Sequence, residues 1–141
     1  MTDPVLSLED RTAILDLIAL YNWRTDTGDA AGVADLFTDD AVWDGEPGRF
    51  EGRQAIEDFN VEVHQRLIGS MHFNANHQFA VKDGVVHHRC SSAFHVLTDD
   101  GLKTYLMTYV DVIVQDEGRW RFQERVNKFW DSENTPPDLC P

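Results

Sequence analysis

The second half of the chain, from Gly69 onwards, alternates apolar and polar residues over long stretches separated by short polar turns. The turns are rich in Asp and Gly and fall at residues 82–84, 98–101 and 115–118. A period of two is typical of strands with one buried face, and Asp and Gly supply the positive φ angles that tight hairpins need. The pattern predicts four long antiparallel strands in sequence, which restricts the chain to folds built around a meander.

The first half of the chain carries helical periodicity instead. A helix is expected from about residue 8 to 26, with a cap at Ser7 and apolar residues at spacings of three and four, namely Ile14, Leu17, Ile18 and Tyr21. Asp29 can cap a short second helix that bears Val33, Leu36 and Phe37. Residues 54–67 repeat the helical spacing and predict a third helix.

Two short strands are expected between the second and third helices, at residues 41–43 and 49–51, on either side of a turn with Gly and Pro. Three helices that cover one face of a meander give an α+β domain. A strongly bent, mostly antiparallel sheet wrapped around a long helix forms a cone with an interior. We predict one domain over residues 1–141, with an irregular tail at 132–141.

Composition limits the possible partners. The 141 residues have a formal net charge of -13, which disfavours binding to nucleic acid or to an anionic membrane surface. No apolar run approaches the ~20 residues that span a bilayer. Cys90 and Cys140 are the only cysteines and form no disulfide framework, so a reduced, cytoplasmic setting is expected. Small apolar molecules and sister subunits are the expected partners.

Three segments carry a resemblance to a known family: LFTDDAVW at residues 36–43, FEGRQAI at 50–56 and GRWRF at 118–122. With the order of elements, they resemble the SnoaL-like branch of the nuclear transport factor 2-like superfamily, over about residues 8–130. The closest resemblance is to the group of scytalone dehydratase, hexachlorocyclohexane dehydrochlorinase and bile acid 7α-dehydratase. The resemblance implies the cone-shaped, cystatin-like fold of that superfamily.

The resemblance also implies a catalytic dyad. In those enzymes an Asp at the end of the first helix pairs with a His at the start of the third strand, and Asp26 and His72 fall at the matching positions. A carboxylate that accepts the Nδ1 proton of an imidazole fixes its tautomer and leaves Nε2 free as a base. Without the resemblance, Asp26 would be interpreted as a solvated helix end and His72 as a half-buried strand residue.

The resemblance suggests Tyr21 as a third catalytic residue, since the bile acid dehydratase group has a Tyr five residues before its Asp. Five residues are ~140° apart on a straight helix, so Tyr21 and Asp26 share a face only if the helix bends. The pocket tyrosine that the dehydratases place after the second helix has no match here, where Trp43 stands instead. The second histidine of scytalone dehydratase matches His87, His88 or His95, and the sequence leaves open which of them faces the pocket.

Four further residues are candidates for substrate binding. Trp43 and Phe94 can stack on a flat substrate, although aromatic residues on strands are more often core. Asn127 and Lys128 on the last strand can hydrogen-bond a substrate oxygen, although solvated positions are the more common interpretation.

Metal binding is the alternative use of the six histidines. His87 and His88 are adjacent and point to opposite faces of a strand, and His72 and His77, five apart, have the same difficulty. We therefore expect no metal and no cofactor; no dinucleotide or phosphate-binding motif is present.

The expected function is a cofactor-independent lyase that removes a proton and eliminates water, or another leaving group, from a small hydroxy-carbonyl, polyketide-like or steroid-like substrate. An isomerase or cyclase could use the same dyad. Other classes are a non-catalytic ligand-binding module and a small subunit of a ring-hydroxylating dioxygenase. The outer sheet surface and the apolar alternation of Tyr105, Met107 and Tyr109 need cover, which predicts a homo-oligomer, and the dehydratase relatives favour a trimer over a dimer.

Overall fold

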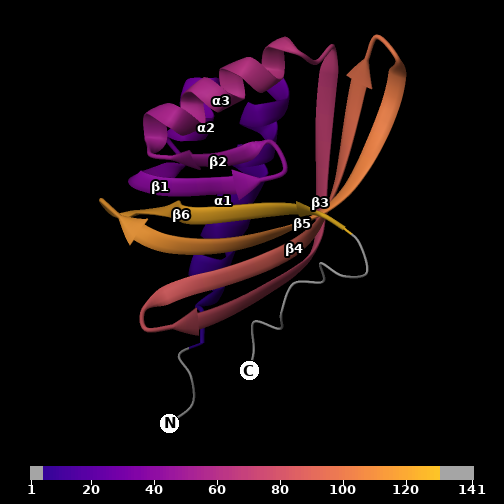
Figure 1. Cartoon of the computed structure of the whole chain (residues 1–141). Coiled ribbons are helices and arrows are strands. Elements are labelled where there is room, and N and C mark those ends of the chain that lie inside the picture. Colours follow the sequence, from indigo (N-terminus) through magenta and orange to yellow (C-terminus); the bar gives the residue numbers. More distant parts are fainter. Residues whose placement is uncertain (1–4, 131–141) are drawn as a thin grey trace.

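A computed structural model describes residues 5–130 (Figure 1). Its elements, in chain order, are α1 (Leu8–Thr27), α2 (Ala30–Ala34), β1 (Phe37–Gly45), β2 (Gly48–Glu51), α3 (Arg53–Gln65), β3 (Gly69–Lys82), β4 (Val85–Thr98), β5 (Gly101–Asp116) and β6 (Arg119–Phe129). The four long strands and the three helices therefore follow the predicted order.

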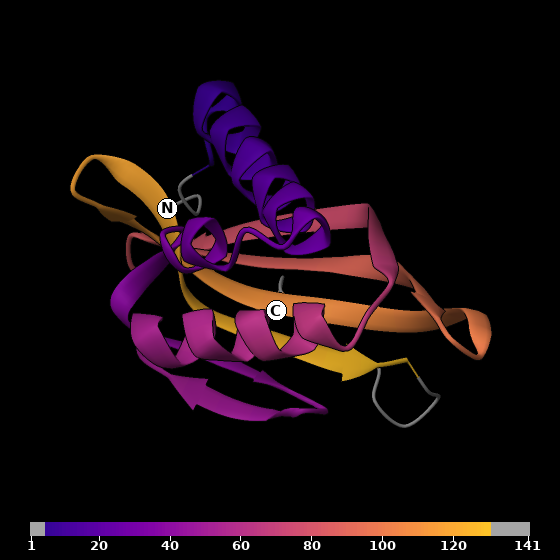
Figure 2. The same cartoon turned by 90° about the horizontal axis from the view of Figure 1, so that it is seen from above.

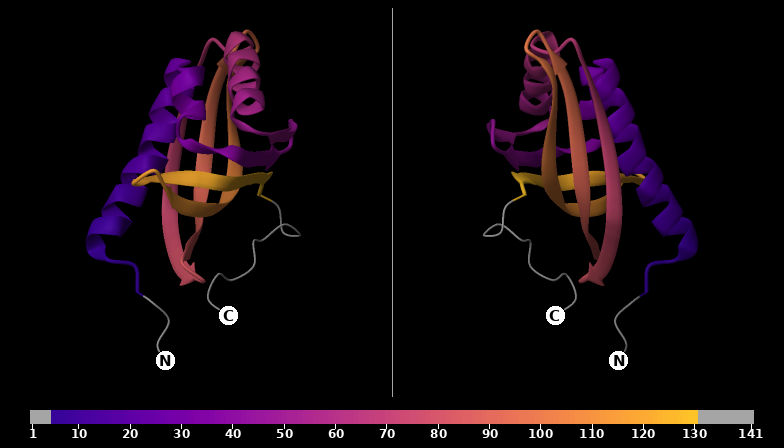
Figure 3. Two further views of the ribbon diagram at one scale, coloured as in Figure 1. Left: turned by 90° about the vertical axis from the view of Figure 1, so that its left-hand side faces the viewer. Right: turned by 90° about the vertical axis from the view of Figure 1, so that its right-hand side faces the viewer.

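The strands form a six-stranded mixed sheet in the order β2-β1-β6-β5-β4-β3. The parallel pairing of β1 with β6 joins the short hairpin to the meander, whose strands are antiparallel to their neighbours. Figure 3 shows the long strands bending, so that the sheet curls toward the helices. Seen from above, α1 and α3 lie over the concave side of the sheet (Figure 2). The predicted cystatin-like α+β fold is confirmed.

Local sequence explains where α1 begins and ends. The Ser7 hydroxyl accepts a hydrogen bond from the backbone N–H of Asp10 at 3.0 Å, which caps the first turn. Gly28 ends the helix with a φ of 78°, a left-handed conformation that other residues rarely adopt. The helix thus extends through Asp26 and stops immediately afterwards.

The second helix is shorter than predicted. Its cap is Asp29, whose carboxylate accepts from the N–H of Gly32 at 2.9 Å. The expectation that Leu36 and Phe37 belong to it is wrong, because the Leu36 carbonyl accepts from the backbone N–H of Phe122 and Phe37 begins β1. Pairing with β6 draws this segment into the sheet.

The core fills the cone between α1 and the concave sheet face. Phe37, Ile113 and Phe122 are fully buried there, together with the apolar stripe of α1. Met107 and Tyr109 are also buried, so the expectation that they need cover from another subunit is wrong. The strand register turns them into the cone, while their neighbour Leu106 is exposed.

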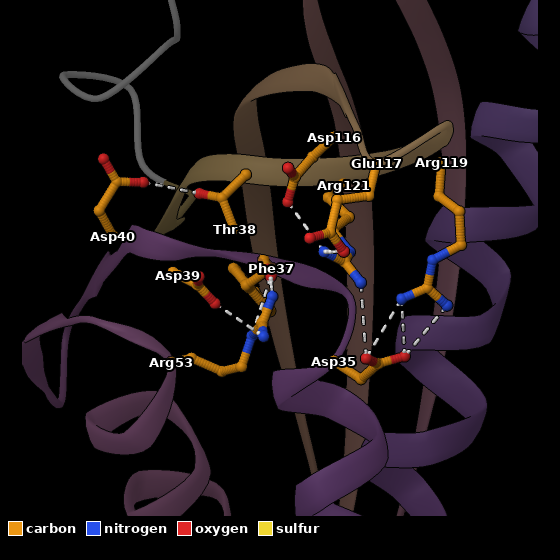
Figure 4. Close-up of polar contacts among 10 residues, drawn as sticks. All are labelled: Asp35, Phe37, Thr38, Asp39, Asp40, Arg53, Asp116, Glu117, Arg119 and Arg121. Carbon is orange, nitrogen blue, oxygen red and sulfur yellow. Dashed lines mark hydrogen bonds and ion pairs between the residues drawn. The ribbon is translucent and has the colours of Figure 1, made fainter.

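A cluster of charged side chains fastens the start of β1 to neighbouring elements (Figure 4). Arg119 and Arg121 of β6 both point at Asp35, at 3.2 and 3.7 Å from its Oδ1. Arg53 of α3 lies 2.8 Å from Asp39 of β1. The Asp35 pairs thus join the turn between α2 and β1 to β6, and the Asp39 pair joins β1 to α3.

No helix within residues 5–130 is long and apolar enough to cross a membrane. The predicted irregular tail at 132–141, with Cys140, lies outside the described residues.

Candidate functional site

Asp26 and His72 meet inside the fold. Asp26 lies in the last turn of α1, and His72 lies near the start of β3. The Nδ1 atom of His72 is 2.7 Å from Oδ1 of Asp26, and their side chains are only 4% and 12% exposed, respectively. The pair is a direct, largely desolvated contact between an imidazole and a carboxylate.

Two further hydrogen bonds hold the carboxylate. The backbone N–H of His72 donates to Oδ2 of Asp26 at 2.9 Å, and the Ser70 hydroxyl donates to Oδ1 at 2.8 Å. Burial alone would raise the pKa of Asp26, but the hydrogen bonds and the charge of His72 outweigh it, so the pKa lies below its ordinary value. Asp26 is therefore ionised at neutral pH.

The ionised carboxylate determines the tautomer of His72. A carboxylate only accepts hydrogen bonds, so Nδ1 of neutral His72 must carry the proton and Nε2 is left with a free lone pair. Phe94, the cross-strand partner of His72, stacks on the imidazole with a ring separation of 4.2 Å and an interplanar angle of 22°. The ring is thus held from the side by Asp26 and across its face by Phe94.

His72 lines a pocket in the interior of the cone with a volume of about 150 Å³. The side chains that line it are mostly apolar or aromatic. They include four residues predicted for catalysis or substrate binding, namely Tyr21, Trp43, Phe94 and Asn127. The indole N–H of Trp43 donates to the Tyr21 hydroxyl at 3.1 Å. The amide nitrogen of Asn127 lies 3.4 Å from the Met107 sulfur, a weak acceptor.

His72 also lines a second cavity of about 340 Å³, a groove between α1 and the edge strand β3. Asp26 and Asn22 of α1 lie on one side of it, and Asn74 and His77 of β3 lie on the other. The Asp26–His72 pair therefore separates the cone pocket from this groove.

Of the other residues predicted for the site, Tyr21 lies in the cone pocket and Lys128 lies outside it. Tyr21 lines the cone pocket although α1 continues unbroken to Thr27. Tyr21 and Asp26 do not need to share a helix face, because the dyad residue that lines this pocket is His72 and not Asp26. Lys128 lies outside the pocket: it is exposed, beside Asp44 and Glu46 in a surface hollow. Since neighbouring strand residues point to opposite faces, the inward position of Asn127 turns Lys128 outward.

A buried polar network was missed by the sequence interpretation. His88, the inward-facing histidine of β4, places Nδ1 2.7 Å from Oδ2 of Asp111, and its Nε2 is 3.0 Å from Nδ1 of His77. Arg125 is fully buried, with Nε 3.2 Å from Oδ1 of Asp111. Of the other candidate histidines, His95 lies 2.9 Å from the Thr104 hydroxyl.

Aromatic rings enclose the Arg125 guanidinium, which lies 3.8 to 4.5 Å from the ring centres of Tyr109, Tyr21 and Phe122. Such cation–π contacts and the Asp111 carboxylate offset the cost of burying the charge. The sequence signal was present as polar residues at inward positions of alternating strands, but only the cross-strand register shows that they meet.

Comparisons with known proteins place the chain in a family. The model of the SnoaL-like domain matches residues 6–126. The comparison with curated proteins found no match. Three similar solved structures come from Novosphingobium aromaticivorans.

The first is a proposed aromatic ring hydroxylase, with 25% identity over 90% of this chain and 93% of its own, and a TM-score of 0.84. A proposed scytalone dehydratase has 20% identity over 88% and 86%, with a TM-score of 0.81. An NTF2-like protein with a cystatin-like fold has 25% identity over 89% and 84%, with a TM-score of 0.80. Because the family model spans residues 6–126, the chain belongs to the SnoaL-like domain family.

Proposed function

We propose that the protein is a cofactor-independent lyase of the dehydratase type, with Asp26 and His72 as its acid–base pair. The observation that carries the proposal is the buried 2.7 Å contact between Nδ1 of His72 and Oδ1 of Asp26. It leaves Nε2 of His72 as an oriented base at the wall of an apolar pocket. Membership of the SnoaL-like domain family and the similarity of this chain in structure to a proposed scytalone dehydratase support the same chemistry.

The proposed reaction is a β-elimination of water. Nε2 of His72 takes a proton from the carbon beside a carbonyl group, and the electron pair of that C–H bond forms the new double bond. The imidazolium then returns the proton to the departing β-hydroxyl, which leaves as water. Asp26 stabilises the transient imidazolium, and the small exposure of both side chains strengthens that attraction.

Pocket residues supply the proposed substrate contacts. Trp43 and Phe94 offer aromatic faces for a flat apolar substrate. The Asn127 amide can donate to the carbonyl oxygen, and Tyr21 can do the same because burial raises its pKa and keeps the hydroxyl protonated. The volume of about 150 Å³ is below the ~300–1,000 Å³ of typical ligand pockets, which favours a small hydroxy-carbonyl compound over a steroid.

An isomerase or a cyclase would begin with the same proton transfer, and the product distinguishes them from a lyase. Loss of water from the substrate, seen by mass spectrometry, identifies an elimination, whereas an unchanged mass identifies an isomerisation.

A second candidate is a subunit of a ring-hydroxylating oxygenase, which is favoured by the similarity to a proposed aromatic ring hydroxylase. In that case oxygenation would need a partner protein, and Asp26→Asn or His72→Gln would leave it unchanged.

The test is a screen of β-hydroxy ketones for conversion to the conjugated enone, and the ultraviolet absorbance of the enone measures the conversion. Asp26→Asn and His72→Gln should each lower turnover by about 10²- to 10⁴-fold, the usual contribution of positioned acid–base catalysis. His95→Gln is the matched control, since this histidine contacts Thr104 and does not line the cone pocket. Full turnover in either dyad variant, with the fold intact by circular dichroism, would refute the proposal.

A further inference from the structure

Three potential metal-ligand side chains meet in the core beside the groove between α1 and β3. They are His77 of β3 and His88 and Cys90 of β4, and their ligand atoms all lie within 4.8 Å of one another. His88 and Cys90 are buried and His77 is half-buried. We propose that this cluster binds a transition-metal ion of the zinc class through two imidazole nitrogens and one thiolate.

The strand geometry brings the three residues to one face. His88 and Cys90 are two apart on β4, so both point into the core. The register between β3 and β4 shifts between Ala75 and Gln78, and Asn76 has a left-handed φ of 59°. This bulge re-aims His77 toward His88, a pairing across strands that spacing along one strand does not reveal.

Hydrogen bonding leaves the ligand atom of His88 available. Asp111 is ion-paired with Arg125, so its carboxylate accepts from Nδ1–H of His88, at 2.7 Å. The Nε2 lone pair of His88 then faces His77, whose Nδ1 must donate to it in the metal-free protein. A carboxylate behind an imidazole is the usual support of a metal-binding histidine, because it fixes the tautomer and increases the basicity of the ligand nitrogen.

The distances are close to those of a tetrahedral site. Zinc–nitrogen bonds of about 2.0–2.1 Å and zinc–sulfur bonds of about 2.3 Å separate two nitrogens by about 3.3 Å, and nitrogen and sulfur by about 3.6 Å. The nitrogens of His77 and His88 are 3.0 Å apart here, and the Cys90 sulfur is within 4.8 Å of both. A small opening between the two rings and a rotation of the thiol would accommodate the ion.

The donor set and the surrounding charges suit a divalent ion of intermediate softness. Imidazole and thiolate together favour Zn²⁺ or Co²⁺ over Mg²⁺ or Ca²⁺, which prefer oxygen. The Arg125–Asp111 pair contributes no net charge, so one thiolate and one divalent ion leave a single positive charge. Three protein ligands leave a fourth position, and His77 lines the groove through which a water or a small anion can reach it.

Binding should release protons in a defined number. A cysteine binds a metal ion as the thiolate, so a Cys90 thiol must lose its proton to the solvent when the ion binds. His77 moves its proton from Nδ1 to Nε2 and loses none when it starts neutral.

The experiment is a titration of tag-free protein with Co²⁺, in a Cys140→Ser background that removes the other thiol. The expected result is one ion per chain, with the visible spectrum of tetrahedral Co²⁺ and a thiolate charge-transfer band in the near ultraviolet. Calorimetry with Zn²⁺ in buffers of different ionisation enthalpy should show release of about one proton per ion.

Variants distinguish this site from adventitious surface binding. Cys90→Ser should abolish the charge-transfer band, and His77→Asn should weaken binding by about tenfold or more. His87→Asn is the matched control, since it removes the neighbouring histidine of the opposite face and should leave both readouts unchanged. No saturable binding, or a band that survives Cys90→Ser, overturns the proposal. Asp26→Asn should bind Co²⁺ normally. The proposed dyad chemistry can therefore fail while metal binding is observed, and metal binding can fail while the dyad chemistry is observed.

Discussion

At the scale of single residues, Asp26 is the side chain on which the site depends, because it alone determines the tautomer of His72. Its three hydrogen bonds come from the His72 ring, the His72 backbone and the Ser70 hydroxyl. Neither Asp26 nor His72 stands out from residue pattern alone, since a polar helix end and a strand histidine are common. The family resemblance selected them, and the structure brings them together.

The lowered pKa of Asp26 predicts a pH dependence of stability. A carboxyl group whose pKa is lower in the folded than in the unfolded state stabilises the fold above the unfolded value, and loses this contribution as pH falls through the folded value. The ordinary value is 3.8. The free energy of unfolding should therefore differ most between wild type and Asp26→Asn at neutral pH.

Urea unfolding at a series of pH values checks this prediction. The difference between wild type and Asp26→Asn should shrink as pH falls below 3.8. Leu20→Ala, an uncharged change at an exposed position of the same helix, is the control, and its effect should not follow the titration of a carboxylate. A constant difference for Asp26→Asn across that range would show that its ionised form is not stabilised by folding.

At the scale of elements, the end of α1 decides whether Asp26 reaches β3. Gly28 closes the helix with a φ of 78°, and a Cβ there would lie 2.4 Å from Nε2 of His64. Gly84 has a φ of 76° in the turn between β3 and β4, with open space around it. The two glycines have nearly the same positive φ, but only Gly28 adjoins the dyad.

This contrast predicts different effects of two alanine substitutions. Gly28→Ala and Gly84→Ala should each cost about 1–2 kcal/mol of stability for the left-handed conformation. Gly28→Ala should also lower turnover, because the last turn of α1 must shift or His64 must move, whereas Gly84→Ala should keep it. Thermal unfolding and steady-state rates measure both effects, and equal turnover in the two variants would contradict the role given to the helix end.

The elements were largely predictable from sequence, but their pairing was not. Alternation and Asp-Gly turns define β3 to β6 locally, and the cap at Ser7 defines the start of α1. The parallel pairing of β1 with β6 joins segments about 80 residues apart and leaves no local pattern, so the sequence predicts a helix at Phe37 where the structure has a strand. The bulge at Asn76 likewise concealed the contact of His77 with His88.

At the scale of the whole molecule, the sheet within residues 5–130 has apolar side chains on both surfaces, buried on the inner one and exposed on the outer one. Phe73, Leu106 and Trp130 are 57%, 57% and 59% exposed and surround a hollow of about 400 Å³ on the outer face. The apolar residues of the inner face fill the core. The exposed apolar residues of β3 and β5, Phe73 and Leu106, are therefore not the ones that the sequence indicated.

The homo-oligomer, with a trimer favoured over a dimer, stays a prediction. We expect light scattering after size exclusion to give three times the chain mass, and Leu106→Asp to shift it toward the monomer, because a charge would be buried at the outer face. Val61→Asp, an exposed apolar position on α3, is the control and should not change the mass. A monomeric wild type would contradict the prediction.

The central claim, that a buried carboxylate holds His72 with a free basic nitrogen, has a direct test that needs no substrate. Nitrogen-15 NMR at slightly alkaline pH reports which ring nitrogen carries the proton. Wild-type His72 should be protonated on Nδ1 and bare on Nε2, and Asp26→Asn should remove this preference. A wild-type His72 with its proton on Nε2 and a bare Nδ1 would contradict it.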